Sequence, residues 1–368
     1  MIYFDNAATT KPLDEAIEIF NNYSKNEYYN ASAGYTPAFE VAKKIEKNKE
    51  IFLQKIHAKG KLIFTSGATE SNNLAILGST FYKNKKYLFS IGEHPSVYNT
   101  AVELKNRGYD VEFISLQKNG QIDYNQFESL MTENVCFVSV MFVNNETGAI
   151  NDLNKIREII DSKNKECVFH VDAVQGLGKI KLNISKSKIN LCSFSAHKIN
   201  GIKGIGALFV SENTKIKNIN YGGGQENNLR SGTVNSPAIM SFFYSIEKSL
   251  ENIDKNLEIV ANLKNYLITK LEKFKNVTIV SNQDCSPYIV SLIINNNRGE
   301  TIMRFLSSKN ILIGTGSACS TSKVGNRVLE SMGYSKQNVI GAIRISFNAF
   351  NNTKEIDEFI ASLKTLIM

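Results

Sequence analysis

Lys198 stands in a sequence context in which a lysine could hold a carbonyl cofactor covalently. It ends the run Ser193–Lys198, and upstream the apolar run Phe169–Asp172 ends in an acid. If both runs are strands, their ends could converge on one ligand. An amine that forms a Schiff base and an anion that pairs with a protonated pyridine nitrogen suit pyridoxal 5′-phosphate. Taken alone, Lys198 could equally lie in a solvated loop, and Asp172 could cap a helix.

A further segment, Ile63–Glu70, could bind the phosphate group of such a cofactor. It reads as a strand that passes through a turn of small residues into a helical pattern over Ser71–Tyr82. Small residues let an anion approach the free N–H groups at a helix N-terminus, where the helix dipole favours negative charge. Many strand-to-helix turns contain glycine and threonine, so this motif is informative only together with the other segments.

These segments belong to a series of short motifs spread along nearly the whole chain. In their order and context they resemble the NifS/IscS-type cysteine desulfurases, a family of class V, fold-type I pyridoxal-phosphate enzymes. The motifs are Tyr3–Thr10, Thr65–Ala75, Val143–Gly148, His170–Ala173, Ser193–Lys198, Arg230–Thr233, Gly316–Ser320 and Ile343–Phe347. The resemblance implies an α/β fold in which a large domain has a mostly parallel sheet covered by helices and a small C-terminal domain is α+β.

The resemblance assigns several residues to the reacting part of the cofactor. Lys198 would form the Schiff base and later move the Cα proton of the substrate, work that requires a partly desolvated amine. Asp172 would pair with the pyridine nitrogen, and Gln175 would hydrogen-bond the phenolic oxygen. His94 would stack on the pyridine face, although a single loop histidine is usually a surface residue. Asn145 matches the family amide near the phenolic oxygen and the substrate carboxylate.

Other matching residues would surround the cofactor phosphate. Backbone groups of Ala68 and Thr69 would contact it, together with the side chains of Thr69, Ser195 and His197. Thr233 matches a threonine that family members supply from the neighbouring subunit. This match implies a homodimer whose active sites contain residues of both chains.

Arg344 and Cys319 decide which substrate and reaction the site would favour. Arg344 lies between two apolar, strand-like residues, so it suits bidentate capture of an amino-acid carboxylate; a structural salt bridge is the alternative. Cys319 lies in the small, polar run Gly314–Ser322, whereas Cys285 lies in a turn-like context and the other cysteines lie in apolar strand patterns. A mobile loop would let the Cys319 thiolate attack the sulfur of bound L-cysteine and carry a persulfide to an acceptor protein.

Composition favours a soluble, cytoplasmic enzyme. A chain of 368 residues is too long to form a single small core, which suits a large domain plus a smaller one. No apolar run approaches the roughly 18 or more residues of a membrane span. Asp5 and Asn6 interrupt the N-terminus before the apolar region of a signal peptide could form. The 5 cysteines include no C-x-x-C pair, which argues against a disulfide framework and a metal site. Lysines dispersed on polar helix faces account for the net charge of +8, so we expect no direct binding of nucleic acid.

Short β-branched and aromatic runs alternate with helical patterns, which predicts a parallel sheet covered by helices. The predicted strands are Lys61–Thr65, Tyr87–Ser90, Val111–Ser115, Val135–Val143, Cys167–Asp172, Asn190–Ser195 and Ala207–Val210. The predicted helices include Ser96–Arg107, Tyr124–Thr132 and Asp152–Ser162, followed by a long amphipathic stretch over Pro237–Phe274 and a last helix over Ile356–Ile367. We predict a large cofactor-binding domain over 13–255 and a small domain, formed by 1–12 and 256–368, that carries the cysteine loop.

Two other classes of function stay open on the sequence. Another fold-type I reaction, such as that of a selenocysteine lyase or an aminotransferase, needs the cofactor site but no persulfide on Cys319. A catalytically silent scaffold would keep only the fold, which the joint presence of Lys198, Asp172, His94, Arg344 and Cys319 argues against. The sulfur acceptor would be a scaffold for iron–sulfur clusters, a tRNA-thiolation protein or a protein of a cofactor pathway, and the sequence favours none of the three.

Overall fold

A seven-stranded sheet forms the centre of the computed structural model, which describes residues 1–315 and 326–367. β8 runs antiparallel to both of its neighbours, and the strands from β7 to β4 are mutually parallel. In spatial order the strands are β2 (Gly60–Thr65), β8 (Gly206–Ser211), β7 (Leu191–Ser195), β6 (Val168–Asp172), β5 (Val135–Ser139), β3 (Lys86–Ser90) and β4 (Asp110–Ile114). The α/β class with a mostly parallel sheet is therefore confirmed.

Each predicted strand of this sheet is present, but β5 is shorter than predicted. It ends at Ser139 instead of Val143. Beyond Ser139 the chain still follows β6, because the N–H groups of Val140 and Phe142 donate to the carbonyls of His170 and Asp172 in that strand. Val143 then pairs with Ile150 across a turn, so the backbone leaves the sheet at the point where it carries Asn145.

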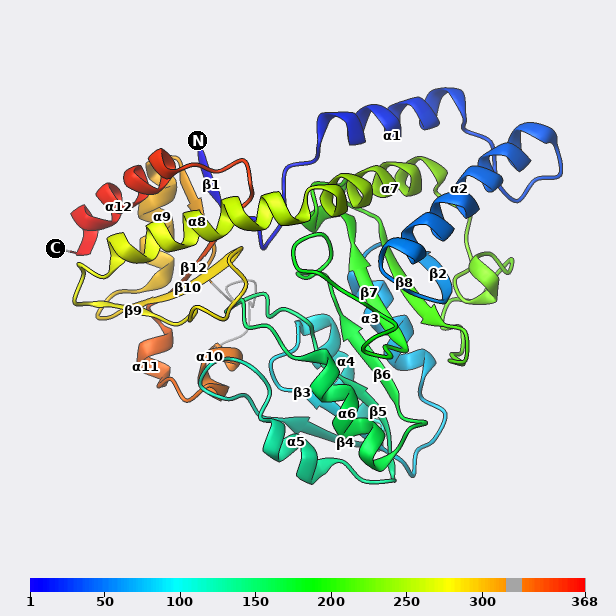
Figure 1. The fold of residues 1–368 in the computed structure, drawn as a ribbon, viewed down its shortest axis with the longest axis horizontal. Helices are drawn as coiled ribbons and strands as arrows, with labels where there is room; N and C mark the ends of the chain where they lie inside the picture. Colours follow the sequence, from blue (N-terminus) through cyan, green and yellow to red (C-terminus); the bar gives the residue numbers. More distant parts are fainter. Residues whose placement is uncertain (316–325, 368) are drawn as a thin grey trace.

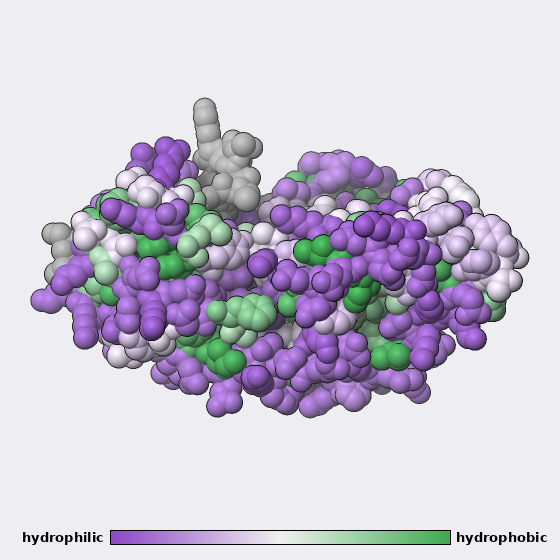
Figure 2. Space-filling model, turned by 90° about the horizontal axis from the view of Figure 1, so that it is seen from above, coloured by the Kyte–Doolittle hydropathy of each residue, from purple (hydrophilic) through white to green (hydrophobic). Residues whose placement is uncertain are grey.

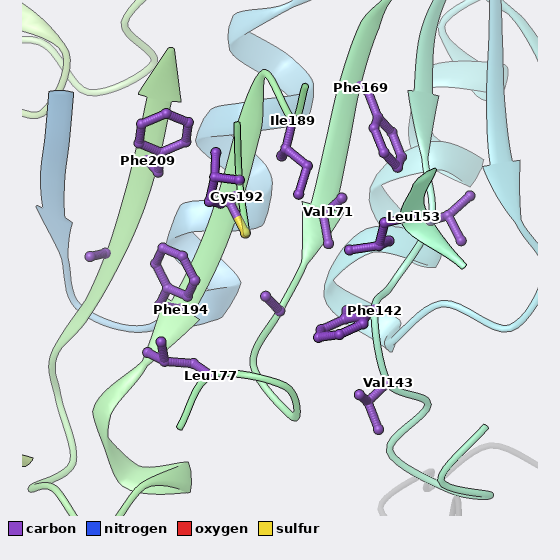
Figure 3. Close-up of a cluster of buried hydrophobic side chains, with 14 of the residues drawn as sticks. Phe142, Val143, Leu153, Phe169, Val171, Leu177, Ile189, Cys192, Phe194 and Phe209 are labelled. Atoms are coloured by element: carbon purple, nitrogen blue, oxygen red, sulfur yellow. The ribbon is translucent and has the colours of Figure 1, made fainter. Parts of the chain in front are cut away.

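Buried apolar side chains cover both faces of the sheet. Successive residues of a strand point to opposite faces, so Leu208 and Phe209 of β8 belong to different buried clusters. Figure 3 shows the cluster on one face, where Phe169, Phe194 and Phe209 project from neighbouring strands. The helices in this part are α1 (Asp14–Asn26), α2 (Thr36–Lys55), α3 (Ala68–Gly78), α4 (Pro95–Asn106), α5 (Tyr124–Leu130), α6 (Leu153–Lys163) and α7 (Ser236–Glu251), with short 3-10 turns η1 (Ala196–Lys198) and η2 (Glu226–Asn228).

Helix α3 is displaced along the sequence from its predicted range. It begins at Ala68 and ends at Gly78, whereas the periodicity predicted Ser71–Tyr82. The start moves upstream because the Glu70 carboxylate accepts the N–H of Ser66 at 2.6 Å and closes the first turn. The end moves upstream because the carbonyl of Gly78 accepts the N–H of Lys217 at 2.8 Å. Three additional N-terminal residues thus become helical at the proposed phosphate site.

The long amphipathic stretch is divided into two helices, α7 and α8 (Ile253–Leu271), with Asn252 between them. Helix α8 runs from the end of α7 to a second group of elements that includes α12 (Figure 1). Those elements are the sheet β12 (Ala342–Ser346), β10 (Ile289–Ile294), β9 (Val277–Ile279), the pair β1 (Ile2–Phe4) and β11 (Ile311–Ile313), and the helices α9 (Gly299–Ser308), α10 (Arg327–Ser331), α11 (Lys336–Val339) and α12 (Thr353–Ile367).

Both ends of the chain meet in a buried cluster of this second group. Phe4 of β1 contacts Phe347 and Phe359 edge-to-face, with ring centroids 5.4 and 6.1 Å apart. The same cluster contains Val260, Leu263 and other residues of α8 and β10. The predicted domain boundaries at residues 12 and 255 stay a prediction, which this separate cluster supports.

Polar residues cover most of the face shown in Figure 2, and apolar patches on that face are small and separated. Among the helices of the described residues, none is long and apolar enough to cross a membrane.

Candidate active site

The ends of β6 and β7 lie side by side and carry the predicted acid and lysine. Asp172, the last residue of β6, is in register with Ser193 of β7, and Lys198 follows β7 in η1. The Lys198 ammonium donates to the carbonyls of Ala7 and Ala8 at 2.6 Å each. The N-terminal segment therefore reaches the same place as the two strand ends. Lys198 is half-buried and not in a solvated loop.

Asp172 is a buried anion held by two donors, and it does not cap a helix. It is 4% exposed; its Oδ1 accepts the N–H of Val174 at 3.0 Å, and its Oδ2 accepts from Nδ2 of Asn72 at 2.8 Å. Burying a carboxylate is costly unless donors or a cation compensate it. Asp172 is therefore suited to pair with a cationic ring nitrogen.

His94 is connected to Asp172 through two side chains. Its Nδ1 lies 2.8 Å from the Ser96 hydroxyl, which also accepts from Nδ2 of Asn72 at 2.9 Å. The imidazole is the N-cap of α4, where it accepts the N–H of Ser96. Burial lowers the pKa of His94; Asp172 opposes this effect and Lys198 adds to it. His94 is thus a neutral imidazole at neutral pH and is not an ordinary surface histidine.

Gln175 shares a hydrogen-bond acceptor with the predicted cofactor lysine. It is 3% exposed, and its Nε2 donates to the carbonyl of Ala7 at 2.9 Å. Because the same carbonyl accepts from Lys198, the amide nitrogen lies close to the lysine amine. The structure therefore brings Gln175 into the predicted site.

Three adjacent strands bring Ser195 beside the start of α3. Gly206 of β8 pairs with Ser195 of β7 on one side and with Thr65 of β2 on the other. A Cβ on Gly206 would lie 2.7 Å from the Cα of Gly67, so only glycine permits this close approach. Ser195 and the first turn of α3, which contains Ala68 and Thr69, thus lie around the same strand ends, and the free N–H groups of that turn suit a phosphate.

A single chain places His197 at the site but does not place Thr233 there. The Nδ1 of His197 lies 3.2 Å from the hydroxyl of Thr9. Burial, followed by the positive charge of Lys198, lowers the pKa of His197 to about 4. Thr233 is exposed, and within the described part of the chain it makes no hydrogen bond to another predicted site residue. One chain alone does not bring Thr233 together with the others.

Arg344 forms the salt bridge that its sequence context allows as the alternative to carboxylate capture, and the capture of a carboxylate stays a prediction. Its Nη2 lies 2.8 Å from Oδ1 of Asp5, and its Nη1 donates to the carbonyl of Asn145 at 2.7 Å. The side chain is buried, yet its Nε has no hydrogen-bond partner among the described residues. The salt bridge with Asp5 holds the guanidinium in place. Because a buried N–H without a partner is costly, Nε is a donor suited to a carboxylate.

Cys319 lies outside the described residues, but the residues on both sides of its segment contact the site. Gly314 and Arg344 exchange backbone hydrogen bonds of 3.0 and 2.8 Å. After the segment, Nη2 of Arg327 donates to the carbonyl of Glu93 at 2.6 Å, and its guanidinium lies 3.7 Å from the ring centre of Tyr98. Both ends of the segment are thus anchored at residues that adjoin Arg344 or His94.

Sequence reasoning missed several buried polar residues of the site, although some are adjacent to predicted ones. Burial and the Asp172 charge raise the pKa of Glu93 well above 4.5, and burial raises the pKa of Glu146 against the opposing charge of Arg344. Each carboxyl has one oxygen without a hydrogen-bond partner among the described residues. Glu93 precedes His94 and Glu146 follows Asn145, so adjacency was the available signal. Asn72 lies within the motif Thr65–Ala75, but sequence reasoning assigned no role to it.

The assembled groups can hold a phosphorylated pyridine aldehyde and an amino acid. They provide an amine, a buried anion, a neutral imidazole, a helix N-terminus and an arginine with an unused donor. Among residues 1–315 and 326–367, no group of three or more histidine, cysteine, aspartate or glutamate side chains could hold a metal ion.

Comparisons with known proteins agree with this chemistry. The aminotransferase class-V family matches residues 2–359. The cysteine desulfurase IscS of Buchnera aphidicola subsp. Baizongia pistaciae is 36% identical over 369 residues, covering 97% of this chain and 90% of the relative. A solved NifS-like protein is 31% identical with a TM-score of 0.93 and covers 99% of this chain and 98% of its own. SspA, solved in complex with cysteine, is 28% identical with a TM-score of 0.84, covering 96% of this chain and all (100%) of its own.

Proposed function

Because the chain belongs to the class-V aminotransferase family and resembles its cysteine desulfurases along nearly its whole length, we propose that it converts L-cysteine to L-alanine and keeps the sulfur as a persulfide on Cys319. The observation that carries this proposal is the backbone pairing of Gly314 with Arg344. Through this pairing, the segment that carries Cys319 begins next to Arg344, which would bind the substrate carboxylate.

Pyridoxal 5′-phosphate is the cofactor of this enzyme. When bound, it supplies an electron sink for bonds at the substrate Cα and Cβ. The chain's own groups fit it: Asp172 for the pyridine nitrogen, Gln175 for the phenolic oxygen and Lys198 for the aldehyde carbon. The start of α3, Ser195 and His197 would hold the phosphate. The close approach of Gly67 to Gly206 supports this cradle.

Four residues of the chain would position the substrate and move its protons. Arg344 would bind the carboxylate, and Nε is the donor without a partner among the described residues, because Asp5 and Asn145 accept from its other nitrogens. By the resemblance to the family, the Asn145 amide would adjoin the same carboxylate. Lys198 takes the proton from Cα, which requires its neutral form, and His94 stays neutral at neutral pH and can exchange a proton with the substrate.

The sulfur-transfer step belongs to Cys319. Its thiolate attacks the substrate sulfur, an S–S bond forms as the Cβ–S bond breaks, and the carbon fragment gains a proton and leaves as L-alanine. The sulfur stays on Cys319 as a persulfide, so the step needs no external oxidant or reductant. The other cysteines are poorer nucleophiles: burial raises the pKa of Cys136, Cys167, Cys192 and Cys285.

We further propose that the enzyme is a cytoplasmic homodimer that passes sulfur to an acceptor protein. Exposed aromatic residues, among them Tyr28, Tyr35, Phe39 and Tyr221, support an additional contact surface. A dimer would let Thr233 of one chain reach the phosphate of the other. The acceptor would be an iron–sulfur cluster scaffold or a tRNA-thiolation protein.

The test is incubation of the purified, cofactor-loaded protein with L-cysteine. We expect alanine in solution and one sulfane sulfur per chain, located on Cys319 by peptide mapping after alkylation. Cys285→Ala serves as the matched control and should react like the wild type. Alanine formed from selenocysteine alone would favour a selenocysteine lyase, and the absence of any product would favour a silent scaffold.

A further inference from the structure

Lys179 is a buried lysine beside the cofactor site that the mechanism above does not use. It is 7% exposed and lies in the tight turn that follows β6 and carries Gln175. Together with Lys198 and Tyr288 it lines a cavity of about 300 Å³. A lysine is rarely buried unless a partner compensates its amine, so its contacts indicate its role.

The Lys179 amine donates to the amide oxygen of Gln175. Nζ of Lys179 lies 3.0 Å from Oε1 of Gln175, and it lies 5.7 Å from the ring centre of Tyr288. The turn brings the two residues together through Gly178, whose φ is +67° and at which a Cβ would lie 2.4 Å from the hydroxyl of Ser249. A larger residue at 178 would therefore move the lysine away from the glutamine.

While Lys179 is protonated, the donors and acceptors around Gln175 permit only one orientation of its amide. An ammonium has only donors, so it requires the oxygen Oε1. The carbonyl of Ala7 has only acceptor capacity, so it requires the nitrogen Nε2, which it accepts at 2.9 Å. A flipped amide would place its oxygen against the Ala7 carbonyl and its nitrogen against the Lys179 amine.

This orientation decides what Gln175 offers to the cofactor site. Nε2 of Gln175 and Nζ of Lys198 converge on the same oxygen of Ala7. A negatively charged oxygen next to the carbonyl carbon held by Lys198 would therefore meet an N–H donor. With the amide reversed it would meet a carbonyl oxygen and be repelled.

We propose that Lys179 is a positioning residue that fixes the Gln175 amide with its N–H toward the phenolic oxygen of pyridoxal phosphate. The inference rests on the proposed function, because it assumes the cofactor at Lys198. Burial, and then the charges of Lys198 and Arg344, lower the pKa of Lys179 to about 7. The amine has N–H donors in both protonation states, so the hydrogen bond to Oε1 is available on either side of that pH.

The test is a double-mutant cycle on cofactor binding, with Lys179→Met, Gln175→Ala and the double variant. Protein stripped of cofactor is titrated with pyridoxal phosphate, and the dissociation constant and the pH dependence of the visible absorption band are measured. Lys179→Met should weaken binding about tenfold and shift the pH at which the band changes. In the Gln175→Ala background the same substitution should change the dissociation constant by less than about threefold.

Lys264→Met is the matched control, because Lys264 is also buried but donates to carbonyls of Asn282 and Cys285. It should leave cofactor affinity unchanged. An equal loss from Lys179→Met in both backgrounds, or no loss in the wild-type background, overturns the proposal.

If Lys179→Met does not fold, Gln175→Glu provides the second arm, because it keeps an acceptor for Lys179 and removes the N–H. It should bind cofactor as weakly as Gln175→Ala, and wild-type affinity would overturn the proposal. Failure of the wild type itself to bind pyridoxal phosphate would contradict the proposed function instead.

Discussion

Nδ2 of Asn72 lies 2.8 Å from the Asp172 carboxylate and also donates to the hydroxyl of Ser96, which in turn contacts His94. Helix α3, which carries Asn72, thereby connects Asp172, the proposed partner of the pyridine nitrogen, with His94, which is proposed to stack on the pyridine ring. The Asn72 side chain is buried, and its Oδ1 has no partner among the described residues. Because both amide hydrogens are used, its rotamer and the positions of both partners depend on one another.

Replacing Asn72 with alanine should therefore weaken cofactor binding. The variant leaves Asp172 with one donor and frees the Ser96 hydroxyl, so we expect the pyridoxal phosphate dissociation constant to rise about tenfold. Titration of cofactor-stripped protein measures this. Asn73→Ala is the control, since Nδ2 of Asn73 donates to the carbonyl of Thr69 within the helix. Equal affinities of the two variants would contradict the role given to Asn72.

Lys198→Ala should abolish the covalent attachment of the cofactor. Borohydride reduction of the wild type should give a stable adduct on the peptide that contains Lys198, and the variant should give none. Mass spectrometry after proteolysis measures this. Lys203→Ala, which changes an exposed lysine nearby, should retain the adduct. An adduct of similar yield in Lys198→Ala would show that another lysine carries the cofactor.

Cys319→Ala should bind cofactor and L-cysteine but release no alanine. The groups that hold the cofactor and the substrate carboxylate lie in the described strands and turns, so the spectral change on adding L-cysteine should persist. Turnover should fall by at least about a thousandfold, because no thiolate remains to take the sulfur. Alanine formation is followed by an enzyme-coupled assay. Wild-type turnover in Cys319→Ala, or trapped sulfur on Cys285, would refute the nucleophile assignment.

Mixed dimers test whether Thr233 completes the site of the partner chain. Dimers that combine Lys198→Ala with Thr233→Ala would have one intact and one doubly altered site if the sites are shared. Their activity should then be about half that of the wild type, at a cofactor concentration that leaves Thr233→Ala dimers mostly unloaded. Differently tagged chains, purified in tandem, allow the measurement. Activity equal to the mean of the two parent dimers would mean that each chain forms its site alone.

The pH dependence of stability should change on replacing His197. Burial and the charges of Lys198, Lys179 and Lys203 lower the pKa of His197 from 6.5 to about 4. As the pH falls through this range, the unfolded chain binds a proton that the folded chain does not, so the free energy of unfolding decreases. His197→Gln removes this loss, which we place at about 1 kcal/mol after discounting for the partial exposure of the ring.

Urea unfolding of the cofactor-free protein near pH 7 and about pH 5 measures this difference. The wild type should lose more stability between the two conditions than His197→Gln. His57→Gln, at an exposed histidine, should follow the wild type. Parallel losses in all three proteins would contradict a folded state in which His197 resists protonation.

The positions that local sequence determines were predicted well. Lys198 follows a strand and Asp172 ends one, and the carboxyl ends of adjacent parallel strands necessarily share an edge of the sheet. Strand periodicity and helix caps such as Asp152 depend on neighbouring residues, so the order of elements could be predicted from the chain alone. The end of β5 and the end of α3 could not, because they depend on contacts with Ile150 and Lys217, whereas the start of α3 depends on the local contact of Glu70 with Ser66.

Only the tertiary structure decided how distant residues complete the site. Arg344 meets Asp5, and the Gln175 amide that accepts from nearby Lys179 donates to Ala7, so the N-terminal segment pairs with residues far away in the sequence. No periodicity encodes such pairs, because they arise when buried charges and amides must find partners after the elements pack. The residue types needed for catalysis could therefore be predicted from the sequence. Packing determined the partners that orient these residues and shift their pKa values.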